Sequence, residues 1–317
     1  MKYVGILRQQ SANNAKSILL LILFPLLLLG LLWVFCAIVF QGVFYDDPDG
    51  YYNMTPNEAF VAYAPVVLAL TVIWFLIAYS LHSWMISSAT HSKPLERRDN
   101  KRVYNLVENL CMAKGMSMPK INVIEDSSLN AFASGINKKS YTVTLTRGII
   151  ERLNDSELEG VIAHELSHIR NRDVRLLVVS IIFVGIFTFI AQFAMRALWY
   201  APNRSRGGKN GGGAAILLLV AAVLAAVGYL ISLLLRFAIS RKREFMADAG
   251  AAEMTQNPFA LASALRKISG NPKVESLQRE DIAQLFIEHP LNKKGGISSL
   301  FATHPPIQKR IEILEQF

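Results

Sequence analysis

Four long apolar stretches alternate with polar segments along the chain. They contain no charged residues, and they cover residues 17–40, 59–86, 176–195 and 214–235. As helices, stretches of this length span the roughly 30 Å hydrocarbon core of a bilayer. The first stretch is too long for the core of a signal peptide and no small-residue cleavage site follows it, so we expect it to be retained. The pattern predicts a membrane protein with about four transmembrane helices.

The polar segments have the periodicities of a folded α+β domain. They predict, in chain order, a helix over 99–114, strands over 121–124 and 141–146, and helices over 147–153, from about residue 155, over 258–269 and from 303 to the last residue. Asn154, Asp155 and Ser156 are residue types that cap helices, and Ser156 with Glu159 has capping-box spacing. We therefore expect a helix that begins near Asp155.

This organisation predicts a membrane α+β protein whose soluble domain is interrupted by a membrane hairpin. We expect an N-terminal membrane region with two spans over 1–90, the first part of the soluble domain over 91–175, the hairpin over 176–235 and the second part over 236–317. Two crossings separate the two soluble parts, so both lie on the same side of the bilayer.

The distribution of charge predicts the orientation. The net charge is +9, and basic residues cluster beside the apolar stretches, whereas the loop over 41–57 carries three aspartates and no basic residue. Because basic loops stay in the cytoplasm, we expect the N-terminus and the soluble domain there. The loop between the third and fourth stretches is also basic, against this bias, but the length of both stretches favours crossing.

Composition excludes some partners. No nucleic-acid-binding module is visible, so the basic residues indicate contact with the lipid bilayer rather than with nucleic acid. The two cysteines, Cys36 and Cys111, have no metal-ligand spacing and imply no disulfide framework.

One short motif carries the candidate chemistry, His164-Glu165-Leu166-Ser167-His168. Residues four apart lie on one face of a helix, so His164 and His168 can bind one metal ion together. Glu165 lies beside them, where it can reach a metal-bound water without being a ligand. This spacing is the signature of zinc hydrolases. The alternative is a solvated helix face that carries two histidines by chance.

A catalytic zinc site usually has three protein ligands and a fourth position for water. Glu244 is the strongest candidate for the third ligand, because Glu244 and Asp248 lie one turn apart in a helical segment after the fourth apolar stretch. Asp248 can then accept the free ring N–H of a ligand histidine. The alternative is an ordinary helix start in which both acids pair with nearby basic residues.

These residues predict hydrolysis of a peptide bond. Zinc lowers the pKa of its bound water to about 7, while Glu165 takes a proton as general base and returns it to the leaving amine. The oxyanion needs a second electrophile, and His304, followed by two prolines, is the candidate. Equally, His304 can be a residue at the start of the last helix with no chemical role.

The same residues resemble the HtpX-type membrane zinc metalloproteases, which are gluzincins related to the CAAX prenyl endopeptidases. The matching motifs run from about residue 100 to the C-terminus in the family's order. They are Asn130-Ala131-Phe132-Ala133, His164-Glu165-Leu166-Ser167-His168, Asn171-Arg172-Asp173, Glu244 with Ala247-Asp248, and Thr303-His304-Pro305-Pro306 with Arg310.

The resemblance implies a gluzincin-type protease domain with one Zn²⁺ ion per subunit on His164, His168 and Glu244, and with Glu165 catalytic. It also implies that the segment Asn130-Ala131-Phe132-Ala133 forms a strand edge that pairs with an extended substrate. The alternative for this segment is a core-facing turn in which Phe132 serves packing.

Membership of the family further implies a multi-pass protein of the bacterial plasma (inner) membrane with a cytosolic active site. Its substrates are then polypeptides, namely misfolded or damaged membrane proteins, and its role is proteolytic quality control under stress. A CAAX-type processing protease is an alternative, but it needs a hydrophobic chamber for a prenyl group, and those relatives have more than four spans. A non-catalytic zinc-binding adaptor is another, against which the intact Glu165 argues, since zinc binding alone does not require it.

Overall fold

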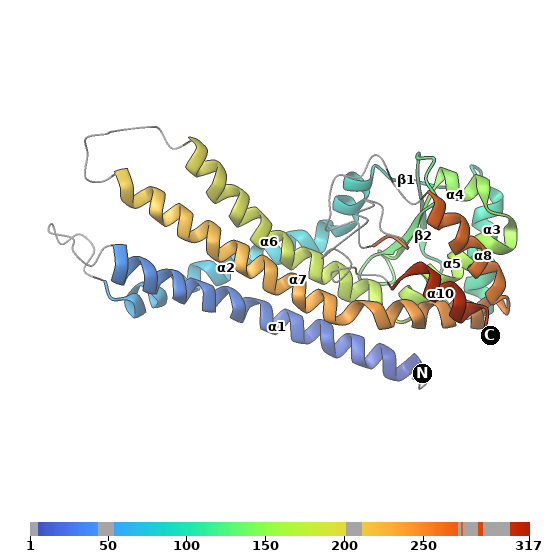
Figure 1. The fold of residues 1–317 in the computed structure, drawn as a ribbon, viewed down its shortest axis with the longest axis horizontal. Coiled ribbons are helices and arrows are strands. Elements are labelled where there is room, and N and C mark those ends of the chain that lie inside the picture. Colours follow the sequence, from blue (N-terminus) through green and yellow to red (C-terminus); the bar gives the residue numbers. More distant parts are fainter. Residues whose placement is uncertain (1–5, 44–53, 201–210, 272–273, 275–284, 288–304) are drawn as a thin grey trace. The chain divides into compact units, whose positions relative to one another are not determined.

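The computed structural model describes residues 6–43, 54–200, 211–271, 274, 285–287 and 305–317. The chain forms two compact units (Figure 1). The mixed unit contains Met1–Ser17, Leu81–Ile181 and Arg236–Phe317, and the helical unit contains Ile18–Ser80 and Ile182–Leu235.

Parts of four long helices supply the helical unit. They are α1 (Ile6–Ile38), followed by a π-helical segment (Val39–Val43), α2 (Pro56–Thr90), α6 (Asp173–Tyr200) and α7 (Gly211–Thr255). Phe24 of α1 stacks on Phe183 of α6 with 4.1 Å between ring centroids, and Phe75 of α2 lies 5.5 Å from Phe183. In α7, Gly228 lies against the ring of Phe187, where any side chain would collide. Aromatic packing therefore joins these helices inside the unit.

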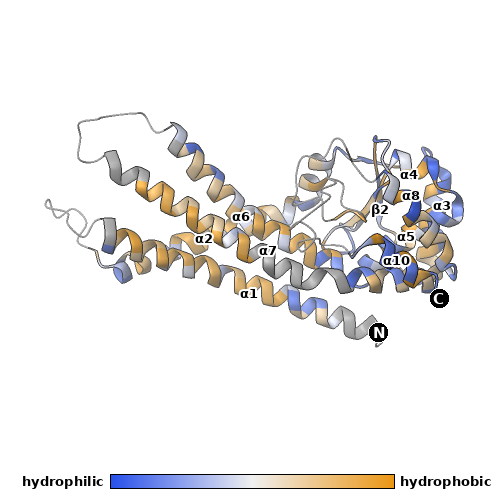
Figure 2. Ribbon diagram, in the orientation of Figure 1, coloured by the Kyte–Doolittle hydropathy of each residue, from blue (hydrophilic) through white to orange (hydrophobic). Residues whose placement is uncertain are grey.

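Three helices in the described part of the chain are long and apolar enough to cross a membrane: Ser11–Gln41, Pro56–Thr90 and Asp173–Ala197. The most apolar windows of the first two are only 11% and 6% buried. Figure 2 shows hydrophobic residues along most of α1. So much exposed apolar surface is stable against lipid and not against water. The fourth predicted span corresponds to a shorter apolar stretch of α7, Ile216–Ile231.

The mixed unit is built on a sheet that has four strands within the described residues. The strands are β1 (Lys93–Pro94), β2 (Lys120–Ile124), β3 (Ala131–Ser134) and β4 (Thr142–Thr146), in the spatial order β1-β2-β4-β3. β2 and β4 are parallel, whereas β1 is antiparallel to β2 and β3 is antiparallel to β4. β3 is therefore an edge strand with respect to these four.

Helices cover this sheet. α5 (Asp155–Arg170) contacts β3 and β4, and it also packs against α3 (Lys101–Ala113) and α8 (Pro258–Gly270). The short α4 (Arg147–Arg152) precedes α5, and α10 (Ile307–Leu314) packs on α8. Within the described residues, the helices and strands predicted for the soluble domain are confirmed, with ends shifted by at most four residues.

A capping box begins α5. The side chain of Asn154 accepts a hydrogen bond from the N–H of Glu157 (2.9 Å), and the Glu157 carboxylate accepts one from the N–H of Asn154 (3.0 Å). The predicted helix start at Asp155 is confirmed. The predicted capping box of Ser156 and Glu159 is wrong, although it has the same spacing.

Contacts with α8 explain which capping box forms. Ser263 and Lys267 donate to the carboxylate of Glu157 at 2.7 and 2.6 Å, which fixes this side chain at the helix start. One turn later, a Cβ on Gly160 would lie only 3.1 Å from the backbone nitrogen of Leu261. The absence of a side chain at Gly160 thus lets α5 and α8 pack closely, which holds the helix that carries the metal motif.

Candidate metal centre

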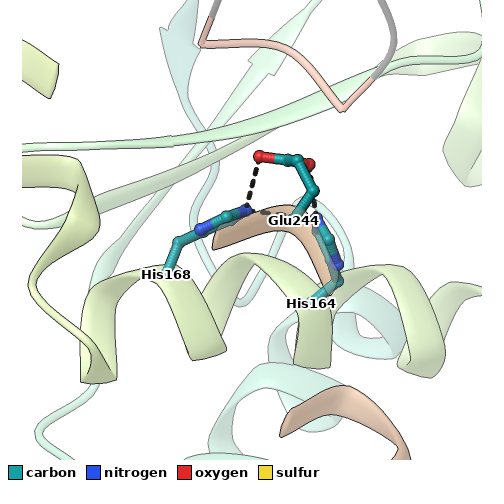
Figure 3. A group of neighbouring side chains, drawn as sticks. All are labelled: His164, His168 and Glu244. Carbon is teal, nitrogen blue, oxygen red and sulfur yellow. Dashed lines mark hydrogen bonds and ion pairs between the residues drawn. The ribbon is translucent and has the colours of Figure 1, made fainter. Parts of the chain in front are cut away.

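Two side chains of α5 and one of α7 converge on a single point. His164 and His168 rise from one face of α5, and the carboxylate of Glu244 lies over both rings (Figure 3). The two Nε2 atoms are 3.2 Å apart, and each lies 3.6 Å from an oxygen of Glu244. The structure thus brings together the three residues predicted as metal ligands.

Each histidine has a carboxylate partner on its other ring nitrogen. Nδ1 of His164 lies 3.0 Å from Asp248 of α7, as expected, and Nδ1 of His168 lies 3.2 Å from Asp173 at the start of α6. Arg172 has φ of 60°, in the left-handed region, so the chain turns sharply between α5 and α6. This turn returns Asp173 to His168.

The donor set fits one zinc ion. Ligand atoms around a tetrahedral zinc are about 3.4 Å from one another, close to the spacings between the two Nε2 atoms and Glu244. Because each Nδ1 atom is paired with a carboxylate, both Nε2 atoms remain available to a metal ion, as in metal-bound histidines generally. Around this cluster, buried carboxylates outnumber buried guanidinium groups, so the surroundings suit a cation; the carboxylates are those of Glu165, Asp173, Glu244 and Asp248, and the guanidinium groups are those of Arg243 and Arg310.

Asn13 of α1 contacts this arrangement from a distant part of the sequence. Its Nδ2 donates to Oδ1 of Asp173 and, at 2.8 Å, to the backbone oxygen of Asn171. Asn13 is completely buried. It therefore holds the carboxylate that orients His168.

Burial and ion pairs act in opposite directions on the ionisable groups. Burial lowers the pKa of His164, but the carboxylates of Asp248 and Glu244 outweigh it and raise this pKa to about 9. Burial raises the pKa of Glu165, and the neighbouring histidines oppose this shift. Burial also raises the pKa of Asp248, but the guanidinium of Arg310 brings it below its usual range.

Arg310 of α10 is completely buried and reaches the same cluster. Its Nε and Nη2 donate to the two carboxylate oxygens of Asp248 at 2.9 and 2.7 Å, and Nη2 lies 3.4 Å from Nε2 of His164. Its Nη1 lies 3.6 Å from Oε2 of Glu244. A buried guanidinium is stable only beside compensating carboxylates, so this ion pair fixes α10 to the candidate ligands.

The predicted substrate-binding segment forms the start of β3. Asn130 precedes the strand, and its backbone N–H and C=O bond to Thr146. Ala131, Phe132 and Ala133 pair with β4 in antiparallel register. The segment is therefore extended and not a turn, but Phe132 is completely buried, as the packing alternative expects, so its role in substrate binding stays a prediction.

Three residues of the site were not identified from their sequence context. Asp173 lies five residues after His168, a spacing that could have been examined for a partner of the second histidine. Asp173 and Arg310 appeared only as members of family motifs, without a role, and no pattern around Asn13 points to Asp173. His304, the predicted second electrophile, lies outside the described residues.

Comparison with known proteins then assigns the family. Residues 97–317 match the model of peptidase family M48. The chain belongs to this family. As an M48 member it is a metalloprotease that acts on polypeptides, and the family together with the His-His-Glu cluster implies a bound metal, typically zinc.

Curated M48 relatives extend over the whole chain. A "Protease HtpX homolog" of Bacteroides fragilis is 58% identical over 323 residues, with 100% of both chains covered. A protein of the same description from Lactobacillus acidophilus is 34% identical over 312 residues, covering 97% of this chain and 98% of that one. The crystal structure of S. mikatae Ste24p aligns with 88% of this chain and 61% of its own at 21% identity, with a TM-score of 0.49, too slight a likeness to transfer any property.

Proposed function

We propose that this M48 protein is a zinc-dependent endopeptidase of the membrane. The proposed zinc ligands are His164, His168 and Glu244, with Glu165 as general base. The observation that carries the proposal is the convergence of the three ligand side chains, whose atoms lie within 4.8 Å of one another. Two imidazole nitrogens from one helix turn and one carboxylate oxygen are a donor set that catalytic zinc sites use.

The roles of the surrounding residues follow from their contacts. Zinc, when bound, supplies a Lewis acid and a water of lowered pKa. Asp248 and Asp173 hold the two ring Nδ1–H groups and so direct both Nε2 atoms. Glu165, whose burial raises its pKa, takes the proton of the attacking water on its carboxylate and returns it to the leaving amine. His304 is proposed as the second electrophile.

The substrates we propose are misfolded or damaged membrane proteins, cleaved at the cytoplasmic face of the bacterial inner membrane. An extended segment of the substrate pairs with the edge formed by Asn130, Ala131, Phe132 and Ala133, and backbone pairing gives affinity with little sequence selectivity. Basic residues beside the apolar stretches support a cytoplasmic site.

The proposed membrane topology has four crossings. Residues 17–40, 59–86, 176–195 and 214–235 are the proposed spans, within a membrane region over 1–90 and a hairpin over 176–235, and residues 91–175 and 236–317 form the protease domain. Labelling a single cysteine tests the orientation. In a Cys36→Ser, Cys111→Ser background, Lys138→Cys should react with an impermeant maleimide only in inside-out vesicles, and Asp47→Cys only in right-side-out vesicles. The reverse pattern would refute the orientation.

The protease site is tested by zinc content and casein cleavage of the detergent-purified protein. We expect one zinc in the wild type, retained zinc without activity in Glu165→Gln, and loss of both in Glu244→Ala. Glu159→Gln, on the same helix, is the control and should behave as the wild type. Full zinc and activity in Glu244→Ala would move the third ligand elsewhere, and a zinc-loaded wild type that cleaves nothing would favour the adaptor or a narrow processing role.

A further inference from the structure

A short segment of the chain itself lies on the strand edge proposed for the substrate. The N–H of Ile287 donates to the carbonyl oxygen of Ala131 at 2.8 Å, and Phe286 pairs with Phe132 in an antiparallel bridge. The opposite edge of β3 is taken by β4. Residues 285–287 therefore pair with the edge that an extended peptide would use.

The side chains of this segment are as buried as those of the core. Phe286 has no exposed surface, and its ring centroid lies 4.7 Å from that of Phe132, with the rings tilted by 54°. Leu285 and Ile287 are 7% and 2% exposed. An aromatic ring in this place gains both apolar burial and a ring–ring contact. The place opposite Phe132 is therefore filled by a large apolar side chain.

The backbone of the segment also reaches the candidate metal ligands. Nη1 of Arg310 donates to the carbonyl oxygen of Ile287 at 3.2 Å and lies 3.6 Å from Oε2 of Glu244. One guanidinium nitrogen thus separates a backbone carbonyl of the segment from a proposed zinc ligand. A substrate that pairs with the same edge of β3 also has to pass beside the candidate ligands, so it needs the space that this segment fills.

We propose that residues 285–287 are an internal pseudosubstrate. They occupy the substrate-binding edge of β3, and a peptide that is to be cleaved displaces them and sets a large apolar side chain against Phe132. This inference rests on the proposed function, because it takes the β3 edge and the His-His-Glu cluster as the protease site. If residues 285–287 leave the edge free for only a fraction of the time, the observed KM for a peptide exceeds the KM of the free edge by the inverse of that fraction.

Kinetics of a Phe286→Ser variant test the competition. The substitution removes the ring that seats the segment, so KM for a quenched fluorescent peptide containing Leu-Phe-Ile should fall by about threefold or more, with kcat unchanged. Val107→Ala, which removes buried apolar atoms from α3, is the matched control and should not lower KM. A purely structural role of Phe286 would lower kcat or the stability and leave KM the same or higher.

A synthetic peptide with the sequence of residues 283–289 gives a second measurement that needs no variant of the protein. It should compete with the fluorescent peptide on the wild type. The same peptide with serine in place of phenylalanine should bind at least about tenfold more weakly, because the buried ring is lost.

The outcomes separate this inference from the proposed function. If the zinc-loaded wild type cleaves no peptide, the proposed function fails first. If the wild type cleaves peptides but Phe286→Ser leaves KM unchanged, the pseudosubstrate is overturned and the protease site stands. Equal inhibition by the two synthetic peptides would overturn the preference for a large apolar side chain, and with it the proposal.

Discussion

Replacing Arg310 with methionine tests how strongly the buried ion pair with Asp248 stabilises the mixed unit. Both side chains are buried, and the guanidinium donates to both carboxylate oxygens. Removing one partner of such a buried pair costs about 3–5 kcal/mol, because Asp248 then loses both guanidinium hydrogen bonds and keeps the ring of His164 beside its carboxylate. For a unit of roughly 200 residues this lowers the apparent Tm by about 10 °C.

The assay is thermal unfolding of the detergent-purified protein with a chelator present, so that metal binding adds nothing to the stability. Lys309→Met makes the same chemical change at the neighbouring, exposed position and should leave the Tm within about 1–2 °C of the wild type. A loss in Arg310→Met no greater than in Lys309→Met would refute the reasoning.

A double substitution separates the uncompensated charge from lost packing. Asp248→Asn removes the negative charge, so in the Arg310→Met background it should cost less than it does in the wild type, by about 1–3 kcal/mol. Strictly additive losses would show that the two side chains do not act as an ion pair, even if each variant is unstable.

Three further predictions concern other parts of the mixed unit. Burial raises the pKa of Glu157, but hydrogen bonds from Lys267, Ser263 and the backbone of Asn154 outweigh burial and lower this pKa. The wild type should therefore be more stable than Glu157→Gln by about 1 kcal/mol at pH 7. In a Tm-against-pH series that difference should begin to fall as the pH drops below the ordinary pKa of a glutamate, about 4.3, and should vanish only at a lower pH, where the carboxylate of the folded protein is protonated as well. Burial raises the pKa of the Cys111 thiol to about 11; in a Cys36→Ser background, mass spectrometry should find no iodoacetamide adduct at pH 8 until the protein unfolds. Asn13→Ala should weaken zinc binding by up to about tenfold in a chelator competition, since Asp173 loses a hydrogen-bond donor; unchanged affinity would contradict this role.

The conflict between two possible capping boxes shows where local patterns stop being decisive. Ser156 with Glu159 and Asn154 with Glu157 have the same spacing and similar residue types. In the structure, Ser263 and Lys267 of α8 bind the carboxylate of Glu157 and so support the second pair. Local spacing could therefore place the start of the helix but could not choose the residues that cap it.

The sequence by itself determined whatever depends on neighbours along the chain. The apolar stretches, the helix and strand periodicities, and the placement of His164 and His168 on one helix face all follow from repeats of a few residues. The pairing of Glu244 and Asp248 with those histidines was also predicted, because each motif has a recognised chemical requirement.

Only the tertiary structure decided the contacts between distant residues that carry no such pattern. Asn13 meets Asp173, Arg310 meets Asp248, and residues 285–287 lie on the edge of β3. Single asparagines, arginines and short apolar segments are common throughout any chain, so their sequence context does not distinguish a buried partner from a solvated one. These contacts are strong because they are buried, and they become buried only when the chain folds.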